Sequence, residues 1–206
     1  MKIPNKELYY DILREVCSFG AGHAASSLSN IIEKKVVITV PEVCMRSVKE
    51  QMSLMGDESK VVVMVNSQFE LGENGTLFYL ATLDDAKSVV GAMACMRIGE
   101  FGELEKSAMG EIGNILSGAI VSSVSNFIEE KIFFDPPNLY IDPPYKILDA
   151  TLGKQIRNVN PILFVSVDIS VEEEKISSTL LFVPLFDLVA KVWDKMSARG
   201  LLVDGL

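Results

Sequence analysis

The sequence predicts an α+β fold made of two copies of one unit, in which a mainly antiparallel sheet packs against two long helices. Three observations lead to this prediction. Two stretches with helical periodicity, about 5–34 and 105–129, each precede a series of β-branched segments. The predicted strands follow one another closely, as antiparallel strands do. The chain also matches itself at a fixed offset, which indicates an internal duplication with a pseudo-twofold relation.

The internal match has an offset of 96 residues (111 − 15 = 96) and extends from the helices into the following loops. The pairs with similar chemistry are Asp11 with Ser107, Glu15 with Glu111, and Pro41 with Pro137. One position differs, because Ser18 stands where the second copy has Asn114. We therefore predict a single domain, 1–206, made of repeats at about 1–98 and 99–206.

In the first repeat, helical periodicity should give way to strands after residue 34. A β-branched run at 36–40 stops at Pro41, and residues 42–58 are ambiguous, with a short helix as one reading. Strands are expected at 60–66 and 76–82, joined by a tight turn at Asn74-Gly75 because both residues tolerate positive φ. A helix capped by Asp84 or Asp85 should then run to about Met96.

The second repeat should follow the same order. The expected elements are a helix at 105–129, a strand at 131–135, an inserted segment at 139–156 with a short helix from Tyr145, paired strands at 161–169 and 177–184, and a closing helix at 186–197. The Gly20-Ala-Gly22 step in the first long helix could loosen that helix or admit a second backbone at close range.

Composition excludes several classes of function. A net charge of −9 and a pI near 4.7 argue against nucleic-acid binding, which requires cations to neutralise phosphates. With 49% hydrophobic residues the chain is not disordered, yet no apolar run is long enough for a membrane span. The N-terminus lacks a signal-peptide pattern. His23 is the only histidine, and the three cysteines have no CxxC spacing, so we expect no metal site, no disulfide and a cytoplasmic location.

The second long helix carries a polar stripe on an otherwise apolar segment. Ser107, Glu111 and Asn114 are spaced i, i+4 and i+7, which places them within roughly 60° of one helical face. The residues expected on the opposite, buried side are Ile112, Leu116, Ala119, Ile120 and Phe127. A single Glu–Asn pair of this kind is usually a solvated face, but here the stripe occurs twice in one chain.

The spacing of Ser107, Glu111, Asn114 and Pro137 resembles the signature of the CheC/CheX/FliY family of chemotaxis phosphatases, and within it CheC most of all. The signature reads polar residue, three residues, Glu, two residues, Asn, twenty-two residues, Pro, and all four positions match. The local segments Glu-Ile-Gly-Asn and Phe-Gly-Ala-Gly-His-Ala-Ala are also similar to CheC. The resemblance covers both halves and implies hydrolysis of the aspartyl phosphate on CheY-P, a response regulator.

The resemblance also implies roles for the site residues. Asn114 would position the attacking water and Glu111 would dock against a lysine of the receiver domain, while Ser107 and Pro137 would be architectural. The first copy, with Asp11, Glu15, Ser18 and Pro41, would be a second and degenerate site, because a serine hydroxyl is shorter than a carboxamide and offers fewer hydrogen-bonding groups. No cofactor is expected on this chain, since the response regulator supplies the Mg²⁺.

Two alternatives remain open at this stage. The chain could be a binding module that regulates CheD, the receptor glutamine deamidase, with Asp142 as a contact, although Pro143 and Pro144 interrupt the expected helix there. It could also be an acidic scaffold whose two helices present Glu and Asn to a protein partner as interface-rim contacts. Acceleration of acyl-phosphate hydrolysis separates the phosphatase from both.

Overall fold

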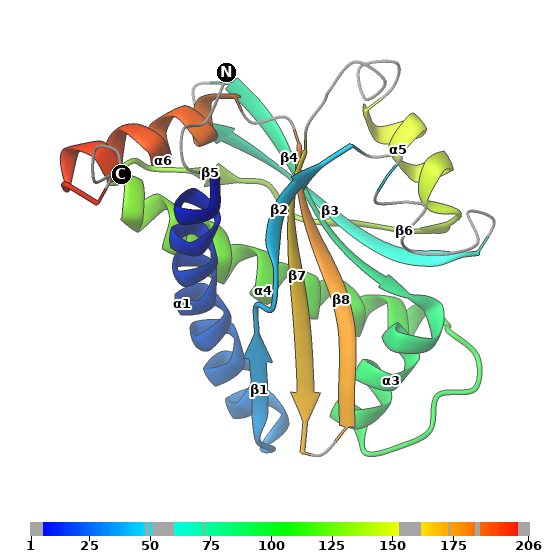
Figure 1. Cartoon of the computed structure of the whole chain (residues 1–206). Helices are drawn as coiled ribbons and strands as arrows, with labels where there is room; N and C mark the ends of the chain where they lie inside the picture. The colour runs from blue at the N-terminus through cyan, green and yellow to red at the C-terminus, as the bar shows by residue number, and fades with distance from the viewer. Residues whose placement is uncertain are drawn as a thin grey trace.

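A computed structural model describes residues 6–47, 50, 60–71, 73–152, 162–172, 174–183 and 186–201. The first half contains α1 (Lys6–Ile32), β1 (Val36–Thr39), β2 (Val43–Arg46), β3 (Val62–Leu71), β4 (Glu73–Thr82) and α3 (Leu83–Ala94). The second half contains α4 (Glu103–Ile128), β5 (Phe133–Phe134), β6 (Asn138–Asp142), α5 (Pro144–Leu152), β7 (Ile162–Val171), β8 (Glu174–Val183) and α6 (Phe186–Ala198). The fold is α+β, as the sequence predicts (Figure 1).

The strands form one antiparallel sheet in which the two halves exchange their edge strands. The order is β1-β7-β8-β4-β3-β5, with β2 also on β7 and β6 also on β3. The edge strands of each half therefore pair with a long strand of the other half. β4 and β8 correspond at an offset of 101 (174 − 73 = 101), and Tyr79 pairs with Leu180 (180 − 79 = 101). Because this pair consists of equivalent residues, the pseudo-twofold axis passes between them.

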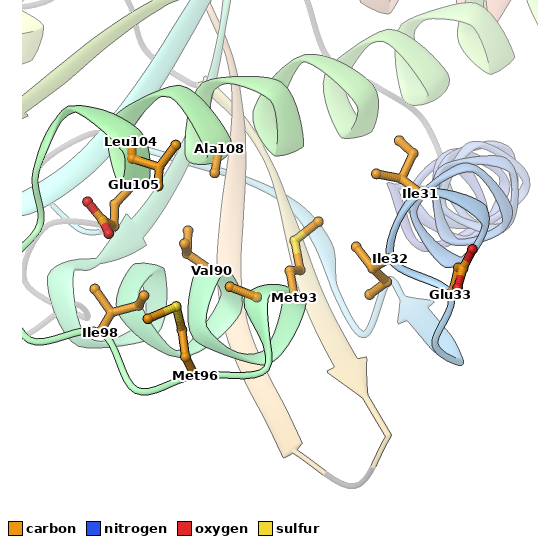
Figure 2. A pocket seen from close by; sticks show the side chains of 11 residues that line it. Ile31, Ile32, Glu33, Val90, Met93, Met96, Ile98, Leu104, Glu105 and Ala108 are labelled. Atoms are coloured by element: carbon orange, nitrogen blue, oxygen red, sulfur yellow. The ribbon is translucent and has the colours of Figure 1, made fainter.

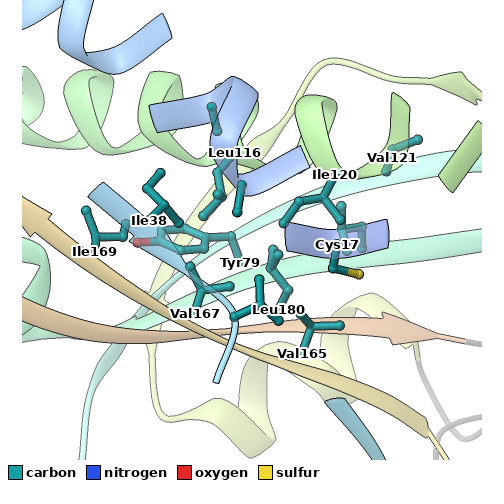
Figure 3. Packing of buried hydrophobic residues seen from close by; sticks show 14 of the residues in the cluster. Cys17, Ile38, Tyr79, Leu116, Ile120, Val121, Val165, Val167, Ile169 and Leu180 are labelled. Carbon is teal, nitrogen blue, oxygen red and sulfur yellow. The ribbon is translucent and has the colours of Figure 1, made fainter. Parts of the chain in front are cut away.

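The long helices α1 and α4 lie on one face of the sheet and cross each other there (Figure 1). The core beneath them joins residues of both helices to the sheet, and includes Cys17, Leu116, Ile120, Tyr79 and Val165 (Figure 3). A smaller cluster on the other face contains Ile147 and Leu148 of α5, packed on β3, β4, β7 and β8. The site helices are thus fixed by burial on their inner sides, and their outer sides remain open.

Two glycines allow the long helices to approach their neighbours. A Cβ atom at Gly20 would lie 2.6 Å from the Cα of Ile120 and 2.8 Å from the carbonyl oxygen of Ala119, so the α1 and α4 backbones touch at this crossing. A Cβ atom at Gly113 would lie 2.9 Å from the side chain of Val65 in β3. The expectation that the Gly20 step admits another backbone is confirmed, and α1 is continuous through it.

The predicted turn at Asn74-Gly75 is wrong. Both residues lie within β4, where they pair with Glu70 and Phe69 of a β3 strand that is longer than expected. Gly75 serves cross-strand packing instead, because a Cβ atom there would meet the Phe69 ring at 2.2 Å. The alternation of buried and exposed residues in β3 does continue to Leu71, which is the signal for the longer strand.

Three further expectations need correction. The α3 helix is capped by Thr82, whose Oγ1 accepts a hydrogen bond from the Asp85 amide, so Asp84 and Asp85 belong to the first turn. Within the ambiguous segment 42–58, residues 43–46 form strand β2, and most of the suggested short helix lies outside the described residues. The segment expected as an insertion from residue 139 begins as strand β6, and its helix, α5, starts at Pro144.

Candidate functional site

The outer face of α4 presents the predicted stripe to solvent. Ser107 and Glu111 are exposed, and Asn114 is half-buried. Among the described residues, neither the Glu111 carboxylate nor the Asn114 carboxamide has a hydrogen-bonding or ionic partner. A carboxamide with free donors and acceptors at an accessible surface can engage a ligand without breaking an internal contact.

Both ends of α4 are fixed by local interactions. At its start, Glu105 Oε2 accepts a hydrogen bond of 2.9 Å from the Gly102 amide, and the acidic residues Glu103 and Glu105 suit the positive end of the helix dipole. The helix ends at Glu129, which has a left-handed conformation with φ of 60°. Rigid ends and a buried inner face hold the stripe in a fixed orientation.

The equivalent stripe on α1 is used differently. The Ser18 hydroxyl donates a 2.7 Å hydrogen bond to the Arg14 carbonyl oxygen of its own helix. The Arg14 guanidinium in turn forms an ion pair of 2.8 Å with Asp11. Glu15 is exposed and shares a shallow groove with residues one to three turns further along, which are Ser18, Phe19, Gly22, His23 and Ser26. Two of the four predicted residues of this copy are therefore engaged locally.

The two motif prolines occupy equivalent loops. Pro41 connects β1 to β2, and Pro137 connects β5 to β6, so each stands between the two edge strands that cross to the other half. Pro41 lines a second shallow groove together with Asp11 and Arg14, which brings two of the predicted first-copy residues together. A proline suits this position because it fixes φ and donates no hydrogen bond to a strand.

Asp142 lies at the end of β6, where it pairs with Val62, and not on a helix. Its carboxylate forms an ion pair of 3.0 Å with Lys146 in the first turns of α5. This hydrogen bond and charge raise the pKa of Lys146 above its ordinary value. The adjacent Tyr145 is exposed.

An apolar groove escaped the sequence reasoning. It has a volume of about 510 Å³ and lies between the end of α1, α3 with the loop after it, and the start of α4 (Figure 2). Three of its lining residues, Ile31, Met96 and Leu104, are large apolar side chains that are mostly exposed. Leu104 and Met96 do not fit the expected pattern of buried helical residues, which is a weak signal in the sequence. Their proximity to Ile31 depends on the tertiary fold and could not be inferred from the sequence.

Other chemistries receive little support from the described part of the chain. It contains no cluster of three or more His, Cys, Asp or Glu side chains suited to a metal ion, and no helix in it is both long and apolar enough to cross a membrane. The three cysteines are free. Burial raises the pKa of the Cys17 thiol to about 12, so Cys17 is not a reactive thiolate.

Comparison with known proteins gives consistent relatives. No family model matches the chain. It is 22% identical over 204 residues to the CheY-P phosphatase CheC of Bacillus subtilis, covering 94% of this chain and 96% of CheC. It is 27% identical over 207 residues to the flagellar motor switch phosphatase FliY of the same organism, covering 94% of this chain but only 51% of FliY.

Solved structures share the fold. FliY from Thermotoga maritima superposes with a TM-score of 0.75 at 21% identity, over 97% of this chain and 100% of that one. FliM from a FliM–SpeE complex of H. pylori gives a TM-score of 0.69 at 16% identity, over 98% and 100% of the two chains. At these identities the structural likeness concerns the fold alone.

Proposed function

We propose that this chain, which belongs to the CheC/CheX/FliY family of chemotaxis phosphatases, accelerates hydrolysis of the aspartyl phosphate of a CheY-type receiver in the cytoplasm. The proposal assigns the reaction to the α4 stripe, with Glu111 and Asn114 as the residues that meet the receiver. It treats the α1 stripe as a degenerate copy with little or no activity.

The observation that carries the proposal is the availability of the Asn114 carboxamide. This side chain is half-buried on a helix fixed at both ends, and it has no partner among the described residues. Because its polar atoms are not enclosed, the amide can bind a ligand without breaking an internal hydrogen bond. At the equivalent position of α1, the Ser18 hydroxyl is satisfied by its own helix at 2.7 Å.

The reaction suits these residue types. A water oxygen attacks phosphorus in line with the aspartyl oxygen, and the phosphorus–oxygen bond to the aspartate breaks. The products are a free carboxylate and inorganic phosphate, which takes both water protons as H₂PO₄⁻ and then equilibrates with solvent. Such phosphoryl transfer depends mainly on positioning and electrostatics. Asn114 can accept from and donate to the water without adding negative charge near the phosphoryl group. Glu111 can form a charged contact with a receiver lysine. The Mg²⁺ would belong to the receiver.

The test is the decay of a phosphorylated cognate receiver, followed with and without this protein. Wild-type protein should accelerate decay, and Asn114→Ala should lower the catalysed rate roughly 100-fold, the usual size of the loss of one positioning hydrogen-bonding group. Asn126→Ala is the matched control, because Asn126 is an exposed amide on the same helix, away from Glu111 along the chain. Activity retained in Asn114→Ala, or lost equally in Asn126→Ala, contradicts the assignment.

The rival role as a CheD-binding module rests on the exposed Tyr145 beside the Asp142–Lys146 ion pair, on the opposite face of the sheet from α4. If that role is the main one, Tyr145→Ala should weaken association with a CheD homologue while Asn114→Ala should not. Receiver dephosphorylation by the wild type then decides whether catalysis accompanies binding. Absence of acceleration with every receiver of the host would favour the scaffold.

A further inference from the structure

The groove at the start of α4 exposes apolar side chains on a protein whose net charge is −9. Its lining is mostly aliphatic, and the exposed fractions are 60% for Ile31, 62% for Met96 and 79% for Leu104 (Figure 2). Such side chains scattered singly are ordinary, but three in one groove indicate an interaction surface. Two carboxylates, Glu33 and Glu105, complete the lining.

The other half of the molecule shows how this chain covers the equivalent surface. Phe127 corresponds to Ile31 (127 − 31 = 96), and the Arg199 guanidinium lies over its ring at 4.8 Å. Glu129 corresponds to Glu33 (129 − 33 = 96) and is held by Lys195 at 2.5 Å and Arg199 at 3.0 Å. In the described residues, Glu33 has no such cation. In the described part of the first half, no cation therefore covers the apolar surface around Ile31 as Arg199 covers Phe127.

Leu104, which lines the groove, lies on the same face of α4 as the stripe. Leu104 and Glu111 are seven positions apart, which places them about 10 Å from each other along the helix and within about 20° of one face. A protein interface of ordinary size buries about 800 Å² on each partner, a patch about 30 Å across. A receiver centred on Glu111 and Asn114 therefore also covers Leu104.

We propose that this groove is the apolar anchor point of the phosphorylated receiver, which inserts an apolar side chain between Ile31, Met96 and Leu104 and brings a basic residue to Glu33. The inference rests on the proposed function and adds an affinity determinant outside the reacting centre. It also gives the second site a contact that the first site does not offer, because the equivalent surface beside the first site is occupied by the chain's own Arg199.

Steady-state hydrolysis of the phosphorylated receiver tests the anchor. Leu104→Ser should raise KM about fivefold and leave kcat unchanged, because the anchor contributes to binding and not to the reacting centre. Glu33→Lys should also raise KM, and by less at high salt. Val37→Ser is the matched control, since Val37 is 42% exposed on β1 and points away from the helix-covered face that its neighbours Val36 and Ile38 line.

The outcomes separate the two proposals. If wild-type protein fails to accelerate decay, the proposed function itself fails. If the wild type is active and Leu104→Ser keeps the wild-type KM, the function stands and the receiver anchor is wrong. A fall in kcat without a change in KM would also overturn the anchor, and circular dichroism of each variant confirms that the fold is retained.

Discussion

The two halves of this molecule share a scaffold and differ at its surface. Each has a long helix that ends in a glutamate with left-handed conformation, Glu33 with φ of 54° and Glu129 with φ of 60°. Each then sends two short strands to the sheet edge of the other half. The positions that differ are on the outside. Ser18 of the first half corresponds to Asn114 of the second. Arg199 covers Phe127, whereas the equivalent residue of the first half, Ile31, is exposed.

This difference shows which constraints act on a duplicated unit. The exchanged edge strands and the helix crossing require both halves to keep their inner faces, because either half alone would leave strand edges unpaired. The outer faces carry no such requirement. One copy is therefore free to change its surface chemistry while it still supplies half of the core that holds the other copy. In α1, the Ser18 hydroxyl is bonded to its own helix.

Exchanging Ser18 of α1 and Asn114 of α4 is expected to give the largest effect and tests whether the two halves differ in catalysis. Asn114→Ser should lower receiver dephosphorylation roughly 100-fold, because the serine hydroxyl can turn back to its own helix as Ser18 does. Adding Ser18→Asn to that variant should restore a fraction of the activity with a higher KM, since Arg199 covers the Phe127 surface beside the first site. Phosphate release at several receiver concentrations measures both effects.

Two outcomes would break the comparison. Full recovery with a wild-type KM would mean that the surroundings of the two sites are equivalent. Undiminished activity in Asn114→Ser alone would mean that the carboxamide is dispensable. Ser26→Asn serves as the control, because Ser26 is an exposed serine of the same α1 groove whose hydroxyl also donates to its own helix, to the Gly22 carbonyl at 3.0 Å.

Neighbouring glycines of α1 sharpen the claim that the inner faces are constrained and the outer faces are not. Gly20→Ala should destabilise the protein by about 3 kcal/mol, because the new methyl group meets backbone atoms of α4 at 2.6 and 2.8 Å that cannot move aside easily. Gly22→Ala should stabilise it by about 0.5–1 kcal/mol, because nothing lies within 4 Å of a Cβ there and alanine is the better helix former. Urea unfolding measures both. Equal effects at the two positions would contradict the close crossing.

The sequence predicted the repeated element order well because that order is encoded locally. Hydrophobic periodicity locates helices and strands, and the 96-residue offset relates their copies. The Asn74-Gly75 prediction failed because turn propensity is a local signal, whereas the Phe69 ring that fills the space over Gly75 comes from the partner strand. Strand β2 was missed since its four residues depend on pairing with β7, more than 100 positions away.

The candidate site was predictable only in part for the same reason. Helical spacing alone places Ser107, Glu111 and Asn114 on one face, and the structure leaves that face accessible. The roles of these residues stay a prediction. The groove around Ile31 and Leu104 could not be inferred from spacing, because it combines three separate segments. The hydrogen bond from the Ser18 hydroxyl to the Arg14 carbonyl oxygen could not be inferred from spacing either, because it depends on the side-chain conformation of Ser18.

The smallest expected effect concerns the equivalent glutamates at the helix ends. Lys195 and Arg199 hold the pKa of Glu129 below its ordinary value of 4.5. A lowered pKa in the folded state stabilises the protein above the ordinary pKa, and this contribution is lost as pH falls through the lowered pKa. Glu129→Gln should therefore lower the urea midpoint slightly at pH 7, and the difference from the wild type should diminish as pH falls below 4.5.

Glu33→Gln should leave the midpoint nearly unchanged at pH 7, because no cation among the described residues pairs with Glu33. The Glu129 effect should be small and should shrink with salt, since that side chain is 62% exposed. If both variants lose the same stability, Glu33 has a cationic partner within this chain. Glu33 would then not be available to a basic residue of the receiver, and the remaining difference between the two halves would be Ser18 against Asn114.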